Sequence, residues 1–132
     1  MAGDFNSLSS LDAPYYAQSK LAHILNVAEH QHSTRDAKYR EKFSDEGKLD
    51  YRILVTLYEA GLVDGRGTQD FVHSVPTKLD TSLDWMNNQH FMRLDYVLVT
   101  PALARHITSC RAVHDATTDK LSDHYPVLCN FN

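Results

Sequence analysis

Residue types that could do chemistry occur in three short stretches that lie far apart in this chain. The first carries Asp4 and Asn6, one residue apart, in a segment of small and polar residues. The second has Asp95 within an apolar, strand-like run, and the third places Asp123 beside His124 at a turn. Stretches separated by scores of residues can meet only through a folded domain. We therefore predict one site at their convergence.

The carboxylate of Asp95 and the imidazole of His124 suit each other chemically. Because side chains alternate along a strand, Asp95 shares a face with Arg93 near the start of the expected strand. A carboxylate there can accept a hydrogen bond from His124 and favour its protonated form, which suits an imidazole that stabilises an anion. Asp123 would then be free to bind a hard divalent cation. The alternative is that Asp123 and His124 only cap a turn.

The N-terminal pair offers a base and an uncharged hydrogen-bond donor. Asp4 could orient a water molecule while the Asn6 amide contacts a phosphoryl oxygen, and Phe5 between them would anchor the turn. The alternative is an Asx-turn, which Asp and Asn form for local reasons. Asn6 and Arg93 are the predicted substrate-binding residues. No strand is expected ahead of this turn to support it.

Zinc binding and a serine triad are both disfavoured by spacing. His23 and His30 are two helical turns apart, and Cys110 and Cys129 are 19 residues apart, whereas structural zinc sites use closely spaced ligands. The adjacent Ser-Asp-His at 122–124 cannot adopt triad geometry, because neighbours on one turn do not point at each other.

The composition is that of one ordinary soluble domain. The chain has 132 residues, of which 42% are hydrophobic and 23% charged. A net charge of -4 provides no basic surface for gripping a phosphate backbone, so an anionic substrate needs a local site or a bound cation.

Cysteine usage and hydropathy bear on the compartment. Cys110 and Cys129 lie in apolar runs, which favours buried free thiols in a reducing compartment, with a disulfide as the alternative. No run reaches the roughly 18 apolar residues of a membrane span, and the N-terminus lacks a signal-peptide pattern. We expect an intracellular, soluble protein with no membrane span.

The order of predicted elements favours an α+β fold. Helices come first and strands follow at short intervals, which suggests a mainly antiparallel sheet with two helices on its outer face. The strands in the last third should form one sheet. The predicted elements are helices over 13–30 and 50–60; strands over 71–75, 92–99, 107–113 and 125–131; a helical turn at 101–104; an exposed, partly helical excursion over 31–48; and a loop over 77–90 that contains Trp85.

Three motifs, Gly3–Asn6, Arg93–Val99 and Ser122–Val127, also carry a family resemblance. In order and approximate spacing they resemble the last three motifs of the endonuclease/exonuclease/phosphatase superfamily, which has a deoxyribonuclease I-like fold. The resemblance covers essentially the whole chain but only the C-terminal half of the family's domain. It implies a single partial domain, residues 1–132, that forms half of a four-layer α/β sandwich.

The resemblance also implies roles for individual residues. Asp4 is similar to the group that orients or deprotonates the attacking water, and Asn6 to a ligand of the scissile phosphate. Asp123 resembles a metal-site carboxylate, His124 the imidazole that stabilises the transition state, and Asp95 the carboxylate that orients it. The implied activity is that of a Mg²⁺- or Mn²⁺-dependent phosphoesterase. The implied substrate is a nucleic acid, a phospholipid head group or an inositol phosphate.

The resemblance leaves part of the family's machinery without a counterpart. The family's N-terminal half supplies the Asn and Glu that hold the principal Mg²⁺ and a further catalytic His. We therefore expect this chain alone to bind the cation weakly. A lone half would also expose an apolar sheet face, which implies the missing N-terminal half as partner, or self-association. The alternative function is that of a non-catalytic half-domain, an interaction or structural module.

Overall fold

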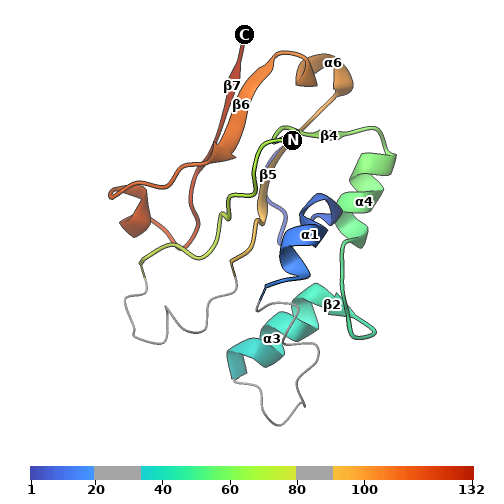
Figure 1. Ribbon diagram of the computed structural model, residues 1–132, viewed down its shortest axis with the longest axis vertical. Helices are drawn as coiled ribbons and strands as arrows, with labels where there is room; N and C mark the ends of the chain where they lie inside the picture. The colour runs from blue at the N-terminus through green and yellow to red at the C-terminus, as the bar shows by residue number, and fades with distance from the viewer. Residues whose placement is uncertain (20–33, 80–90) are drawn as a thin grey trace.

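The computed structural model describes residues 1–19, 34–79 and 91–132 and shows a mixed helical and antiparallel fold (Figure 1). The predicted α+β class is confirmed. The strands are β1 (Ala2–Asp4), β2 (Ser44–Asp45), β3 (Lys48–Leu49), β4 (Val63–Asp64), β5 (Asp95–Val99), β6 (Ile107–Ala112) and β7 (Val127–Phe131). The α-helices are α1 (Ala13–Tyr16), α3 (Thr34–Phe43), α4 (Arg52–Glu59) and α6 (Pro101–Ala104), and two 3-10 helices are η1 (Ser10–Asp12) and η3 (Thr118–Lys120).

Strand β5 is the centre of a three-stranded antiparallel sheet in the order β1-β5-β4. Strands β6 and β7 form a separate antiparallel hairpin. The prediction that residues 92–99, 107–113 and 125–131 form one sheet is therefore wrong. The physical reason is that β1 and β4 already use both hydrogen-bonding edges of β5, so neither edge is left for the hairpin.

Strand β1 supports the acidic turn that we expected to lack a strand. Asp4 lies directly opposite Asp95 in the β1–β5 register, and the Phe5 amide donates to the Leu94 carbonyl at 2.9 Å. The Phe5 ring also packs edge-on against Tyr96, with ring centroids 5.8 Å apart. The expected anchoring role of Phe5 is thus confirmed. The prediction that this turn lacks a supporting strand is wrong, because three residues suffice for a strand when a longer neighbouring strand completes the pairing.

Alternate residues of β5 face the helices. Tyr96 and Leu98 are buried against Leu54 of α4, together with Leu57 and other partly buried apolar residues. A neighbouring core cluster joins α1, α3 and the start of the β5 segment, and its buried members are Leu8, Tyr16, Phe43, Val75, Met92 and Leu94. The helix predicted over 50–60 is confirmed as α4, on the outer face of the sheet.

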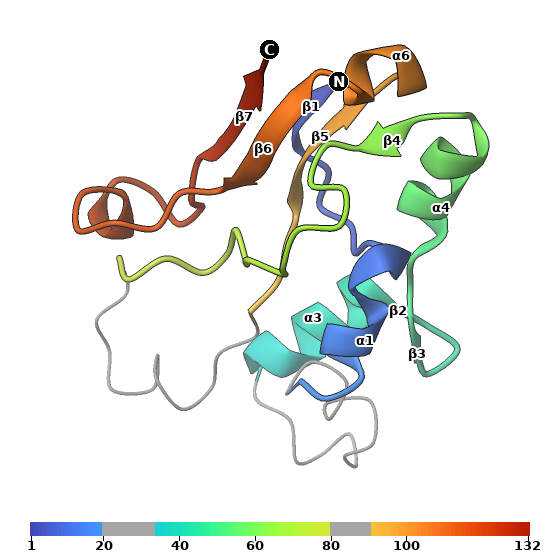
Figure 2. The same ribbon diagram turned by 45° about the horizontal axis from the view of Figure 1, so that its top comes forward.

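The β6–β7 hairpin lies on the other side of β5, away from α1 and α4, in both views (Figure 2). Gly65, next to β4, shows how close the approach is. A Cβ at this position would lie 2.9 Å from the Val97 carbonyl and 3.1 Å from the sulfur atoms of Cys110 and Cys129. The hairpin therefore covers part of the sheet face that we expected to be open.

Cys110 and Cys129 form a disulfide between β6 and β7. The two residues are direct partners in the antiparallel register, with Cα atoms 4.0 Å apart. The prediction of free thiols is wrong, because a separation of 19 residues does not reveal that two cysteines will be cross-strand partners. The argument for a reducing compartment assumed free thiols, so it no longer holds.

Other predicted elements have mixed outcomes. The excursion at 31–48 is less exposed than predicted, because Phe43 of α3 is 2% exposed and belongs to the core. The strand at 71–75 is reduced to a single bridge between Val75 and Met92. Most of the helix predicted over 13–30, and Trp85 with most of its loop, lie outside the described residues. Among the described residues, no helix has the length and apolar character to cross a membrane.

Candidate active site

His124 and Asp95 are joined by a hydrogen bond at the start of β5, the central strand of the sheet. His124 Nδ1 lies 2.7 Å from Asp95 Oδ2, and both side chains are partly buried. With the proton on Nδ1, the imidazole donates to the carboxylate, which fixes the tautomer and ring orientation. The predicted pairing of these residues is thus present in the structure.

Asp4 and Asn6 form the neighbouring turn. Asp4 Oδ1 accepts from the Asn6 backbone amide at 2.7 Å, and Asp4 Oδ2 accepts from Asn6 Nδ2 at 2.8 Å. This is the Asx-turn that we considered as the alternative, and Asn6 adopts a left-handed backbone with φ of 49°. The local turn does not exclude a chemical role, because the pairing of Asp4 with Asp95 brings the same turn to the imidazole.

The three titratable side chains meet at one point. Asp4, Asp95 and His124 each offer a ligand atom, and these atoms all lie within 4.8 Å of one another. Asp95 and His124 border a cleft of about 490 Å³ between strands β1 and β5 and the segment that leads into β7. The residues that line it are Ala2, Gly3, Asp95, Tyr96, Val97, Leu121, Ser122, His124, Tyr125, Pro126 and Val127.

This donor set fits a hard divalent cation. Carboxylate oxygens are the ligands that Mg²⁺ and Mn²⁺ prefer, and an imidazole nitrogen is also acceptable to Mn²⁺. Asp4 and Asp95 already accept hydrogen bonds, but each carboxylate oxygen has a second lone pair for a metal. The carboxylates of Asp4 and Asp95 could therefore hold one ion beside His124.

Comparison with known proteins assigns the chain to a family. The model of the endonuclease/exonuclease/phosphatase family matches residues 1–124. The chain belongs to this family. No curated protein and no solved structure matches the chain. Membership supports a metal-dependent phosphoesterase or nuclease activity at the level of the family as a whole.

The family resemblance assigned a metal-binding role to Asp123, which the structure places beside the cluster but outside it. Its side chain is exposed and accepts from the Ser122 hydroxyl at 3.2 Å, while its carbonyl accepts from the Thr77 amide. The role of Asp123 in metal binding stays a prediction.

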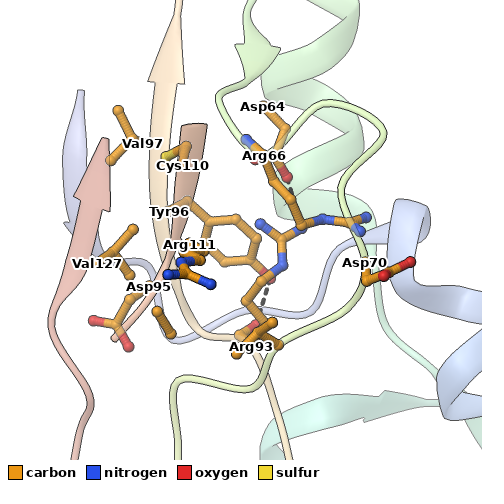
Figure 3. Close-up of a pocket in the computed structure, with 12 residues that line it drawn as sticks. Asp64, Arg66, Asp70, Arg93, Asp95, Tyr96, Val97, Cys110, Arg111 and Val127 are labelled. Atoms are coloured by element: carbon orange, nitrogen blue, oxygen red, sulfur yellow. Dashed lines mark hydrogen bonds and ion pairs between the residues drawn. The ribbon is translucent and has the colours of Figure 1, made fainter. Parts of the chain in front are cut away.

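Arg93 lies apart from the cluster, in a buried charge network (Figure 3). Its guanidinium donates to Asp12 at 2.8 Å and to Asp64 at 2.6 Å, and it packs over the Tyr96 ring at 4.3 Å. Burial alone would lower the pKa of Arg93, but the carboxylates of Asp64 and Asp12 outweigh it and raise the pKa. These partners give Arg93 a structural function, and substrate binding by it stays a prediction.

Two further residues support the site without having been predicted. The buried Ser74 hydroxyl accepts from the Leu94 and Asp95 amides at 2.9 and 3.2 Å, and the Ser74 carbonyl accepts from the Tyr125 amide at 2.7 Å. Ser74 therefore ties the strand of Asp95 to the segment of His124. A lone serine gives no sequence signal for this, because the role depends entirely on its tertiary neighbours.

The second residue is Lys42, at the end of α3. Its ammonium group donates to Asn6 Oδ1. This contact fixes the orientation of the Asn6 amide, with its oxygen toward the Lys42 ammonium group and its nitrogen toward Asp4. Nothing in a charged, polar helix distinguishes Lys42 from the other lysines of the chain, because its contact spans 36 residues.

Proposed function

We propose that this chain hydrolyses a phosphate ester with the help of a divalent cation. The observation that carries the proposal is the hydrogen bond of 2.7 Å between His124 and Asp95, formed beside the Asp4–Asn6 turn in a single cleft. Family membership supports the same reaction class. In-line phosphoryl displacement is helped chiefly by positioning and by neutralising oxygen charge, which such a group of residues can do.

Each residue has a role in this proposal. Asp4 orients and deprotonates the attacking water. The Asn6 amide donates one hydrogen to Asp4, and its second hydrogen donates to a phosphoryl oxygen. In its imidazolium form His124 donates from Nδ1 to Asp95, so the N–H at Nε2 is the group that stabilises or protonates the phosphoryl group. Asp95 acts through His124 as a positioning residue.

The cation is proposed to be Mg²⁺ or Mn²⁺, held by Asp123 and by carboxylate oxygens of Asp4 and Asp95. The bound ion supplies positive charge that neutralises the phosphoryl oxygens. His124 is kept for the substrate because its Nδ1 already serves Asp95. On the motifs at Gly3–Asn6, Arg93–Val99 and Ser122–Val127, we further propose that the chain corresponds to the C-terminal half of the family's four-layer sandwich.

The test is hydrolysis of bis-p-nitrophenyl phosphate with and without Mn²⁺. We expect metal-dependent hydrolysis by the wild type, lowered about 10² to 10⁴-fold by His124→Ala and by Asp95→Asn. Because Asp95 acts partly through His124, the double variant should lose less activity than the product of the two single losses. Asp45→Asn is the matched control, since Asp45 pairs with Arg52 on the exposed surface, away from the cleft.

Two results would contradict the proposal. One is wild-type activity that does not depend on the metal or on His124. The other is no hydrolysis by the wild type, which would favour the alternative of a non-catalytic half-domain that serves as an interaction or structural module.

A further inference from the structure

A second hollow lies next to the candidate active site and is lined by aromatic rings. It has a volume of about 480 Å³, and its lining includes His73, Phe91, His114 and Tyr125. Tyr125 lines this hollow and also the cleft of the candidate active site. Tyr125 directly follows His124 in the chain. Tyr125 is therefore a wall that the hollow shares with the cleft that contains His124.

The rings of the hollow are packed against one another and held by polar contacts. His114 stacks on Tyr125 with ring centroids 3.8 Å apart and planes 27° apart, and the His114 Nε2 atom lies 2.8 Å from the His73 carbonyl oxygen. The Tyr125 hydroxyl donates to Asp119 at 2.6 Å. His73 lies 4.4 Å from Phe91 and 4.5 Å from His114, between ring centroids. Such a surface is preorganised, because its rings do not have to be ordered when a ligand binds.

The polar groups of the hollow favour a flat, uncharged ring. Burial and the neighbouring His114 ring lower the pKa of His73 to about 4, so His73 is neutral at pH 7. Lys78 lies at the rim and is paired with Asp119 at 2.8 Å, with its side chain 61% exposed. Asp115 and Asp119 also line the hollow, which suits an uncharged ring that carries hydrogen-bond donors, such as the amino group of a base, better than an anion.

We propose that this hollow is a stacking subsite for one nucleobase of a single-stranded nucleic acid whose phosphate lies at His124. The proposal rests on the proposed function and specifies its substrate class. Bases stack on aromatic side chains irrespective of sequence, because every base has a π-face. The sugar ring of an inositol phosphate and the head group of choline lipids have no such face.

The test is fluorescence titration of a single-stranded DNA oligonucleotide that contains one 2-aminopurine, with EDTA present so that no turnover occurs. We expect the wild type to bind and to quench the fluorescence, because the fluorescent base stacks in the hollow. His114→Ala should raise Kd about tenfold, in the range measured for the loss of one stacking side chain. His114→Phe keeps a ring at this position and should stay close to the wild type.

Control variants separate stacking from loss of folding. Phe131→Ala removes an exposed ring on β7, outside the hollow, and should leave Kd unchanged. Thermal melting checks each variant, and Phe91→Ala replaces His114→Ala if the latter does not fold. The proposal is overturned if wild-type protein does not bind, if removing the ring leaves Kd unchanged, or if glycerophosphocholine displaces the oligonucleotide.

The outcome can be distinguished from failure of the proposed function. If the protein binds the oligonucleotide through the hollow but hydrolyses no ester, the subsite is supported and the proposed reaction is contradicted. If the protein hydrolyses bis-p-nitrophenyl phosphate but its ring variants bind the oligonucleotide as the wild type does, the proposed reaction is supported and the subsite is contradicted.

Discussion

His73 is the residue whose environment most clearly links structure to pH. Burial, followed by the charge of the neighbouring His114, lowers the pKa of His73 from 6.5 to about 4. The folded state therefore binds fewer protons than the unfolded state between these pH values. The stabilisation is complete above pH 6.5 and is lost as the pH falls toward 4.

We predict that the free energy of unfolding falls between pH 7 and pH 4 and that His73→Gln removes part of this fall. The full shift corresponds to about 3 kcal/mol, and solvent screening at this half-buried ring reduces the expected effect to about 1–2 kcal/mol. Urea titrations at several pH values measure it. The variant separates the effect of His73 from that of Asp12. Burial raises the pKa of Asp12, so Asp12 changes the free energy of unfolding with pH in the opposite direction.

The control for this prediction is His106→Gln, which replaces an exposed ring at the end of α6. It should keep the wild-type pH dependence. The carboxylates of Asp115 and Asp119 do not interfere, because hydrogen bonds lower the pKa of each below 3.8 and outside the window. Identical slopes for the wild type and His73→Gln would refute the prediction.

At the scale of elements, Arg93 joins parts of the fold that share no strand pairing. Arg93 lies just before β5 in the chain. Its guanidinium connects Asp12 of η1 with Asp64 of β4. Arg66 adds a second cation 3.0 Å from Asp12. A buried carboxylate is tolerated only when it is paired, so these contacts hold η1 against the sheet that contains β4.

We predict that Arg93→Met destabilises the fold by about 3–5 kcal/mol, because it leaves two buried carboxylates without their main partner. The measurement is equilibrium unfolding in urea. The matched control is Arg52→Met, which removes an exposed arginine paired with Asp45 and Asp50 and should leave the stability nearly unchanged.

The triple variant Arg93→Met, Asp12→Asn, Asp64→Asn should recover part of the lost stability, since the unpaired charges are gone. If Arg93→Met is no more destabilising than Arg52→Met, the network does not have this structural function. Arg93 would then be available again as a substrate-binding residue.

At the scale of the whole molecule, the β6–β7 hairpin reduces the area of apolar sheet face that we expected to be exposed. It covers part of one face of β5, yet large apolar side chains remain exposed on β7 and beside the cleft. Leu128 is 54% exposed, Phe131 46% and Leu121 69%. Apolar burial contributes about 25 cal/mol per Å², so a patch of several hundred Å² would favour association.

We predict that the chain self-associates in a concentration-dependent manner and that Leu128→Glu weakens the association. Sedimentation equilibrium measures both. Ile53→Glu, at an exposed apolar position on α4, is the control and should leave association unchanged. A monomer at high concentration would contradict the prediction and would mean that the hairpin covers enough of the sheet.

The sequence by itself determined the local features of this protein. Helical periodicity predicted α4, runs of apolar residues predicted β5 and β6, and the chemistry of short motifs predicted that Asp4, Asn6, Asp95 and His124 would lie together. These features follow from neighbours within a few residues, and residue type and spacing record such neighbours directly.

Only the tertiary structure decided which segments are partners. The short strand β1, the disulfide between Cys110 and Cys129, and the separation of the hairpin from the central sheet all depend on pairing between distant segments. Arg93 shared a face with Asp95 in the sequence pattern, but buried carboxylates on η1 and β4 engage it instead. Long-range pairing depends on which edges and charges remain unoccupied after the chain folds, and no local pattern contains that information.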